Sequence, residues 1–259
     1  NRKWRPSCGI FAIMISVIDP SPKLRQNFCL MKISTLFLSA IFLIGICSLE
    51  AEILFDGGNL QKFDFATGSW EIEKDGSMVC RMAESRDKKG NKRLRGMGYI
   101  WTKKEFSDFD LTLSYKLSPG ANSGVFYRTD KTNPVQGGFE LQLMDNEGFQ
   151  KKANRKLPPR KLNGSFYDCL APAGEFSKPV GQWNQLRLTC KGPQVTCHIN
   201  GKKSFSVNVD DWDTPGRNPD GSENKFKTAL KDLPRNGRIG FQNHGQVVWF
   251  KDIKIQTPK

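Results

Sequence analysis

The stretch DFDLTLSYKLS, residues 108–118, decides the fold class because apolar and polar residues alternate along it without a break. An extended chain points successive side chains to opposite faces, so this period of two predicts a β-strand with one buried face. The apolar side chains on that face are Phe109, Leu111, Leu113, Tyr115 and Leu117.

The same alternation recurs through the chain from about residue 52 to the C-terminus, and we find no amphipathic helix of ten residues or more there and no internal repeat. Two packed antiparallel sheets are the usual way to bury strands that are apolar on one face. We therefore expect an all-β protein, an antiparallel β-sandwich forming a single domain over 52–259 with long loops at its rim. The expected strands include two around a turn at 74–76 and others within 122–128, 139–144, 183–190, 195–199, 203–209, 238–242 and 247–255.

The segment 31–51 has the pattern of a secretory signal peptide. It begins with Met31 and a basic Lys32, continues with an apolar run from Leu36 to Ile46, and offers a small residue, Ala51, as a cleavage site. The apolar run is short for a membrane span. We therefore expect export to the periplasm, the cell surface or the medium, with no stable membrane span after cleavage.

Residues 1–30 begin with Asn and show neither a strand period nor a helix period. We expect them to be a non-native extension upstream of the true start.

The chain is strongly basic, with a formal net charge of +14. Residues 1–51 hold six Lys and Arg against two Asp and Glu, so the rest carries about +10. The basic residues gather at 86–95, 151–161 and 217–235, which lack apolar periodicity and are expected to be loops. They either keep the protein soluble or attract acidic polymers. Motifs of nucleic-acid binding are missing from the sequence, so no nucleic-acid partner is expected.

Four cysteines follow residue 51: Cys80, Cys169, Cys190 and Cys197. Alternation directs Cys190 and Cys197 inward from the two strands of a hairpin. Export permits disulfides, but only a directly opposed pair brings the β-carbons close enough, so the register decides and the disulfide is left open. With two histidines in the chain and no CxxC, a structural zinc site is not expected.

The stretch GFELQLMDNEG, residues 138–148, holds the first group of candidate site residues. Glu140 and Gln142 face away from the apolar side of the strand, and Asp145 could turn back to the same side where the strand ends. Two carboxylates separated by an amide suit acid–base work on sugars. The alternative is a solvent-facing strand followed by a turn at 145–148.

Two further stretches contribute polar residues. In PGANSGVFYRTD, residues 119–130, Asn122 opens a strand, Gly124 permits close approach of a ligand, and Arg128 could hold a carboxylate or a polarised oxygen. Arg128 could equally be a structural partner of a carboxylate. In RIGFQNHGQVVWF, residues 238–250, His244 lies in a turn, either as a proton carrier or ligand or simply exposed. From the residues alone, the result is an exported β-sandwich with a polar cleft and no defined reaction.

Several blocks of the sequence, in this order, resemble a known family: LFDGGNL, GANSGVFYR, FELQLMDN, GSFYDCLAP, KPVGQWNQLRL, HINGK and RIGFQNHGQVVWFKDIKI. On these blocks the chain resembles the 3-keto-disaccharide hydrolase domain family from about residue 52 to the C-terminus. The segment 210–237 is similar to a long loop of planctomycete-type members. The resemblance implies a concanavalin A-like jelly roll, similar to laminarinase-type β-glucanases, with a ligand cleft on one sheet. Where those glucanases have Glu-x-Asp-x-x-Glu, this chain has Glu140, Gln142 and Asp145, and an amide at 142 cannot titrate.

The resemblance implies a glycosidase-type hydrolase that acts on 3-keto-glycosides by proton abstraction at C2, elimination and hydration. The implied roles are a base at Glu140 or Asp145, an enolate stabiliser at Arg128 or a bound cation, and a proton donor at His244 or Tyr167. The substrate contacts implied for the sugar are Asn122, Gln142, Tyr167 and Asn243.

The family pattern QDHG reads QNHG here, with Asn243 in place of a carboxylate. No cofactor is therefore assigned, and a divalent cation is left open. Two alternatives on the same fold remain, a non-catalytic carbohydrate-binding module and an adhesion domain that binds polyanions through its basic loops.

Overall fold

The computed structural model describes residues 49–86, 89–96 and 98–258. The expected upstream extension, 1–30, and the expected signal peptide up to residue 48 lie outside the described residues. The first described strand, β1 (Leu49–Phe55), includes the expected cleavage position at Ala51. Within the described ranges, no helix is both long enough and apolar enough to cross a membrane.

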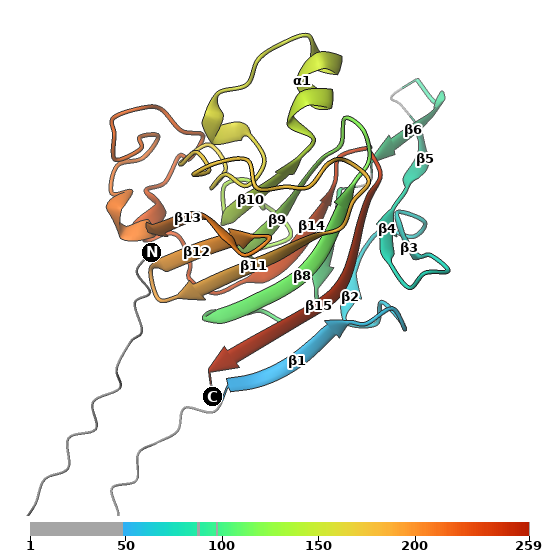
Figure 1. Cartoon of the computed structure of the whole chain (residues 1–259), viewed down its shortest axis with the longest axis horizontal. Helices are drawn as coiled ribbons and strands as arrows, with labels where there is room; N and C mark the ends of the chain where they lie inside the picture. Colours follow the sequence, from blue (N-terminus) through green and yellow to red (C-terminus); the bar gives the residue numbers. More distant parts are fainter. Residues whose placement is uncertain (1–48, 87–88, 97, 259) are drawn as a thin grey trace, which may run out of the picture. The chain divides into compact units, whose positions relative to one another are not determined.

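One sheet has eight strands and is antiparallel (Figure 1). Its longest strands, β8 and β15, lie side by side at its centre, and β15 also pairs with β1. The order along the sheet is β13 (Lys202–Asn208), β12 (Gln194–Ile199), β11 (Asn184–Lys191), β8 (Phe109–Leu117), β15 (Val248–Pro258), β4 (Met78–Cys80) and β3 (Trp70–Ile72).

A second antiparallel sheet has five strands. Its order is β10 (Phe139–Met144), β9 (Asn122–Thr129), β14 (Arg238–Asn243), β7 (Gly98–Thr102) and β2 (Phe63–Asp64). A separate hairpin consists of β5 (Met82–Arg86) and β6 (Lys92–Gly96).

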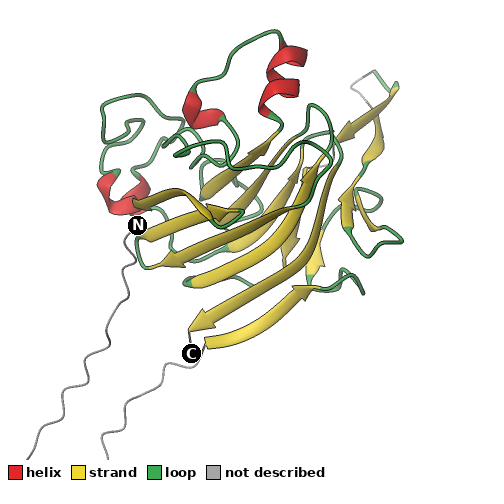
Figure 2. Cartoon of the chain, viewed as in Figure 1, coloured by secondary structure: helices red, strands yellow, loops and turns green. Residues whose placement is uncertain are grey.

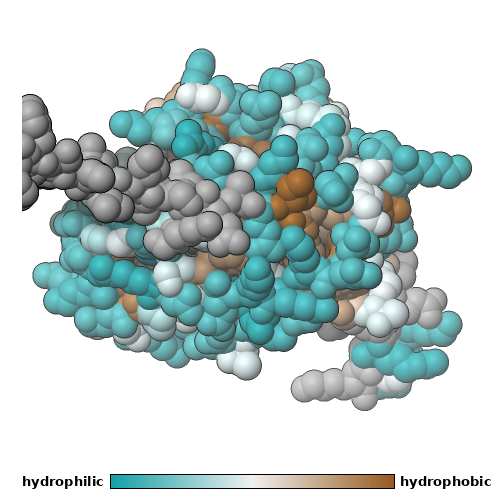
Figure 3. All heavy atoms as spheres, turned by 90° about the horizontal axis from the view of Figure 1, so that it is seen from below, coloured by the Kyte–Doolittle hydropathy of each residue, from teal (hydrophilic) through white to brown (hydrophobic). Residues whose placement is uncertain are grey.

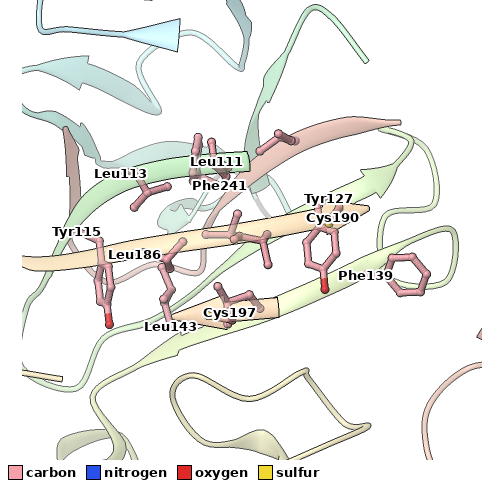
Figure 4. Close-up of a cluster of buried hydrophobic side chains, with 14 of the residues drawn as sticks. Leu111, Leu113, Tyr115, Tyr127, Phe139, Leu143, Leu186, Cys190, Cys197 and Phe241 are labelled. Carbon is pink, nitrogen blue, oxygen red and sulfur yellow. The ribbon is translucent and has the colours of Figure 1, made fainter. Parts of the chain in front are cut away.

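The core lies between the two sheets, where the apolar faces of the alternating strands meet. All five apolar residues expected on the inner face of β8 are buried, and so are the alternate residues of β10. Figure 4 draws part of this core, with Tyr115 of β8 and Leu186 of β11 from the eight-stranded sheet and Tyr127 and Phe139 from the five-stranded sheet. The expected antiparallel β-sandwich is confirmed, and the jelly-roll arrangement agrees with it.

Helical structure is sparse and lies in the loops, as Figure 2 shows. The single α-helix of the described residues is α1 (Asn146–Ala153), and short 3₁₀ turns occur at Pro159–Lys161, Val209–Asp211 and Leu230–Asp232. The long loops at 145–183 and 209–237 are the expected rim loops. On the face drawn in Figure 3, most of the coloured surface is hydrophilic and the hydrophobic side chains are scattered.

The four described cysteines are buried and free. The register of the β11–β12 hairpin explains this, since Cys190 lies opposite Val195 and Cys197 lies opposite Leu188. The inward orientation expected from the sequence is confirmed, and the open question of a Cys190–Cys197 disulfide is answered by the register: the thiols are not opposed.

Candidate active site

The candidate site lies on the side of the five-stranded sheet that faces away from the core. On β10 and β9, Glu140 lies opposite Phe126, and Gln142 lies opposite Gly124. A cavity of about 200 Å³ opens beside these residues. Its lining consists of Asn122, Phe126, Val135, Glu140, Gln142, Tyr167, Lys225, Gln242 and His244.

The loop residues 164–167 run along the free edge of β10 and pair with its backbone. Gly164 N donates to Gln142 O at 2.8 Å, and Tyr167 N donates to Glu140 O at 3.0 Å. All six residues of β10 are buried, although the sequence alternates as a half-exposed strand would. This pairing also explains how Tyr167 comes to line the same cavity as Glu140.

Glu140 is only 6% exposed, and the absence of a side chain at Gly124 makes room for it. A β-carbon at position 124 would lie 2.7 Å from Glu140 Oε1, closer than such atoms approach in proteins. Gly124 thus allows a carboxylate to fold over the neighbouring strand. The close approach expected at Gly124 from the sequence is made by the Glu140 side chain itself.

Lys225 is the charged partner of Glu140, with Nζ 3.1 Å from Glu140 Oε2. The same ammonium group lies 4.4 Å from the centre of the Tyr167 ring, a cation–π contact. Burial raises the pKa of Glu140 above its ordinary value, Lys225 opposes that rise, and the charge of Asp168 adds to it. Burial, together with the charges of Glu140 and Asp168, raises the pKa of Tyr167 to about 12.

Two amides supply neutral polar groups. Gln142 Nε2 donates to Asn122 Oδ1 at 3.0 Å. Gln142 Oε1 is buried and has no hydrogen-bond partner among the described residues. A buried acceptor without a partner is costly, and a ligand hydroxyl would satisfy it.

Aromatic rings flank the cavity on the same side of the sheet. Tyr99 of β7 lies 4.7 Å from Trp101 and 5.0 Å from Phe126, measured between ring centres. Trp101 lies over Gly240, where a β-carbon would come within 2.3 Å of the indole ring. The site therefore combines one buried ion pair, amides and aromatic surface, a set of groups suited to binding a sugar.

Five of the eight residues expected in the site line the cavity together: Asn122, Glu140, Gln142, Tyr167 and His244. His244 is exposed, as a residue at the rim would be.

Arg128 does not join them, which corrects the expectation that it faces a cleft. Its side chain is fully buried. The guanidinium group donates to Ser107 O at 2.8 Å and Gly192 O at 2.7 Å, and it pairs with Asp108 at 3.1 Å. These partners occupy the guanidinium group. Arg128 is therefore a structural partner of a carboxylate, the alternative considered from the sequence, and that carboxylate is Asp108.

Asp145 does not line this cavity either, and the expectation that it shares a surface with Glu140 is not met. Its carboxylate caps α1 by accepting from Gly148 N at 3.1 Å, and it accepts from Gly120 N at 2.7 Å. A strand end followed by a helix start uses the carboxylate locally.

Asn243 is likewise structural rather than part of the cavity. It is 4% exposed, and its Nδ2 donates to Arg81 O at 2.7 Å. The place of Asn243 among the expected sugar contacts is therefore corrected.

Lys225 and Gln242 line the cavity but are not predicted from the sequence. Gln242 could have been found, because it lies on the same face as Tyr99 in the register of β14 with β7. Lys225 carries no local signal, since it lies 85 residues from Glu140 in a loop without periodicity.

Elsewhere, a larger cavity of about 710 Å³ lies on the eight-stranded sheet. Thr112, Gln185, Arg187 and Lys254 in its lining are exposed, and it has no buried ion pair like that of Glu140 and Lys225. In the part of the chain that the structure describes, no three His, Cys, Asp or Glu side chains cluster as metal ligands would.

The fold and the cavity define a β-sandwich protein with a polar site on the outer side of one sheet. Residues 50–256 match the model of the 3-keto-alpha-glucoside-1,2-lyase-like domain, and the chain belongs to this family. The family membership expected from the sequence blocks is confirmed.

Comparison with known proteins is consistent with this family membership. A putative glycosyl hydrolase from Parabacteroides distasonis is 30% identical, with a TM-score of 0.68, over 80% of this chain and 98% of that one. A second putative glycosyl hydrolase from that organism is 23% identical, with a TM-score of 0.62, over 81% of this chain and 94% of that one, and it shows the fold alone. A 3-keto-disaccharide hydrolase from Bacteroides thetaiotaomicron is 26% identical over an alignment of 173 residues, and the match covers 59% of this chain and 59% of that relative.

Proposed function

We propose that this protein is an exported enzyme that cleaves 3-keto-glycosides, including 3-keto-disaccharides, by elimination followed by hydration. The observation that carries the proposal is Glu140, a buried carboxylate in a polar cavity whose neighbour along the strand is the amide Gln142. A retaining or inverting glycosidase needs two titrating carboxyl groups at the scissile bond. With Asp145 used as a helix cap and Gln142 unable to titrate, a reaction with one base fits this cavity better.

Glu140 is the base of the proposed reaction. The 3-keto group makes the C2 hydrogen acidic, and the carboxylate removes that proton to give an enolate across C2 and C3. Burial raises the pKa of Glu140, which makes its carboxylate a stronger base than an exposed one.

The enolate then re-forms the C3 carbonyl, a double bond forms between C1 and C2, and the bond from C1 to the leaving oxygen breaks. That oxygen takes a proton from Tyr167 or His244, which both line the cavity. Addition of water across C1 and C2 places a hydroxyl on C1 and a proton on C2. The sum is hydrolysis of the glycosidic bond.

Gln142 and Asn122 are assigned to the sugar hydroxyls. Gln142 Oε1 lacks a partner in the described part of the chain, and its amide nitrogen is held by Asn122. The orientation of the pair is therefore fixed before a ligand binds, which lowers the entropic cost of binding.

The test is to incubate the purified domain, residues 52–259, with 3-keto-trehalose and to follow the release of 3-keto-glucose. Glu140→Gln should lower kcat/KM by about 10²- to 10⁴-fold, the usual range for loss of a general base. Glu147→Gln is the matched control, because Glu147 is an exposed carboxylate on α1.

Absence of turnover by the folded wild-type domain, with or without added divalent cations, would sink the catalytic proposal. Sugar binding without turnover would instead favour a carbohydrate-binding module. Binding of sulfated polysaccharide that collapses on adding salt would favour the adhesion domain.

A further inference from the structure

Lys225 lines the cavity from the long loop 210–237, and the side chain of Gln136 holds the loop backbone at this point. Gln136 Nε2 donates to Lys225 O at 2.8 Å, and Lys227 N donates to Gln136 Oε1 at 2.9 Å. The next residue, Phe226, is 2% exposed and packs in the core. Lys225 is thus fixed on both sides of its α-carbon.

The ammonium group of Lys225 is itself largely removed from water. Its side chain is 18% exposed and that of Glu140 is 7% exposed. Bringing two charges out of water is expensive, and the attraction between them offsets that cost only with close contact. A neutral side chain at 225 would leave Glu140 without this ion-pair partner, so the loop places a cation where the proposed base needs one.

From this arrangement we infer that Lys225 is a catalytic residue that stabilises the enolate oxygen formed at C3 of the substrate. The inference rests on the proposed function. Glu140 takes the C2 proton and becomes neutral, while the electron pair of the broken C–H bond moves toward the C3 oxygen, which becomes negative. Lys225 keeps its protons throughout and has one negative partner before the step and one after it.

The charge therefore moves from a carboxylate to an enolate within one cavity while the cation stays in place. A preorganised cation in a site shielded from water stabilises developing charge more than the same cation in water does. Arg128, the stabiliser implied by the resemblance, is occupied by Ser107, Gly192 and Asp108. Lys225 fills the role that Arg128 cannot.

Other charged or titratable groups also act on Glu140. Asp168 opposes its ionisation, Tyr99 and Tyr167 are coupled to it electrostatically, and His244 lines the same cavity. Asp168 is paired with Arg160 at 3.3 Å and with Lys161 at 3.2 Å. Lys225 is the cation that contacts the Glu140 carboxylate directly.

The experiment compares Lys225→Met, Lys225→Arg and Lys227→Met with the wild type, after circular dichroism has shown that each variant is folded. Lys227 is an exposed lysine two residues along the same loop and serves as the matched control. Two reactions are followed, release of 3-keto-glucose from 3-keto-trehalose and exchange of the C2 hydrogen of 3-keto-glucose in D₂O. The second reports proton abstraction without a leaving group.

We expect Lys225→Met to lower kcat and the exchange rate by about 10²- to 10³-fold, the usual effect of removing one group that stabilises an oxyanion. KM should change less than kcat, Lys225→Arg should recover part of the rate, and Lys227→Met should match the wild type. The acid limb of the rate profile should also move to higher pH in Lys225→Met, since Lys225 holds the pKa of Glu140 down.

An active wild type with Lys225→Met within about threefold of it in both reactions would overturn the inference and leave the proposed function standing. If Lys225→Met does not fold, Lys225→Gln takes its place as the neutral variant, and rates within about threefold of the wild type in both reactions have the same consequence. An inactive wild type would overturn the proposed function and this inference together.

Discussion

Glu140 shows how a single position acquires chemistry from its neighbours. Alternation along β10 directs Glu140 outward, Gly124 leaves space for its side chain, and Tyr167 and Lys225 from two loops line the cavity around it. Each of these contributions comes from a different part of the chain. The carboxylate is consequently a buried base paired with a cation instead of an exposed surface charge.

The burial of Glu140 predicts the pH dependence of the proposed reaction. Burial raises its pKa above the ordinary value of 4.5, Lys225 works against that rise, and Asp168 adds to it. The base must be ionised, so kcat/KM should increase as the pH rises through the pKa of Glu140. We expect the midpoint of the acid limb to lie above 4.5.

A pH–rate profile measured with 3-keto-trehalose checks this dependence, and isotope-edited infrared titration of the Glu140 carboxyl provides an independent value. Glu147→Gln should leave the profile unchanged. A midpoint at or below 4.5 for the folded enzyme would contradict the account of Glu140 as a base with a raised pKa.

The sequence predicts Gln142 and Asn122 on their strands, and it misses Gln242 on β14 and Lys225 on a long loop. Gln142 and Asn122 follow from alternation, because a period of two assigns each of them a face. Lys225 depends on how a long loop folds back over β10, and no local pattern encodes that. Arg128 and Asp145 have the residue types of a site, yet nearby backbone groups use their side chains.

At the scale of the element, the junction between β10 and α1 explains why Asp145 is not a second catalytic acid. The chain leaves the strand at Met144 and starts a helix at Asn146. A helix start leaves backbone N–H groups without partners, and a carboxylate at the preceding position accepts from them. Asp145 therefore serves the helix, although its spacing from Glu140 matches the spacing of glucanase acids.

The strands were easier to predict than this helix. The nine-residue strand β8 is predicted by five alternating apolar side chains, all of which are buried. The eight-residue α1 has no buried residue and hence no apolar stripe. Its sequence signals are the cap at Asp145, the acidic Glu147 in the first turn, and the basic Lys151 and Lys152 in the last turn. The expectation of a simple turn at 145–148 did not take these signals into account.

Substitution of Asp145 tests its role as a cap. Asp145→Ala removes the acceptor for both Gly148 N and Gly120 N and should lower the free energy of unfolding by about 1 to 2 kcal/mol. Asp145→Asn keeps one acceptor oxygen and should lose less. Urea unfolding measures both values.

The activity of these variants on 3-keto-trehalose separates a cap from a catalytic acid. Both should stay within a few-fold of the wild type while folded. If Asp145→Asn lost well over tenfold in activity while keeping its stability, Asp145 would have to be a catalytic residue.

In the whole molecule, both sheets contribute to the core, and only the five-stranded sheet carries the candidate site. Inner faces of both sheets form one core, and the outer side of the five-stranded sheet carries the candidate site beneath the loops. Because loops 145–183 and 209–237 provide Tyr167 and Lys225, the site depends on loops being held on a rigid sheet. The overall fold was predictable because each strand shows its alternation in its own sequence. The positions of the two loops beside the site were not, because they depend on contacts made only in the assembled domain.

The buried cysteines of this core lead us to expect no disulfide, although we expect the protein to be exported. Cys190 and Cys197 face the core from neighbouring strands but lie opposite Val195 and Leu188, so their β-carbons are not placed for a bond. Burial raises the pKa of Cys190 to about 12 and that of Cys80 to about 11, which keeps both thiols protonated and unreactive near neutral pH. Stability should therefore come from packing, without a covalent contribution.

We expect dithiothreitol to change the Tm of the domain 52–259 by less than about 1 °C, since a native disulfide typically contributes several kcal/mol and its reduction would lower Tm by several degrees. Thiol titration should find almost no reactive thiol in the folded domain and all four after unfolding in urea, because all four cysteines are buried and free. Protein recovered from an oxidising compartment provides the stringent case. Two missing thiols after unfolding, together with a reductant-sensitive Tm, would show a covalent bond and would mean that the hairpin register in the oxidised protein differs from the one described.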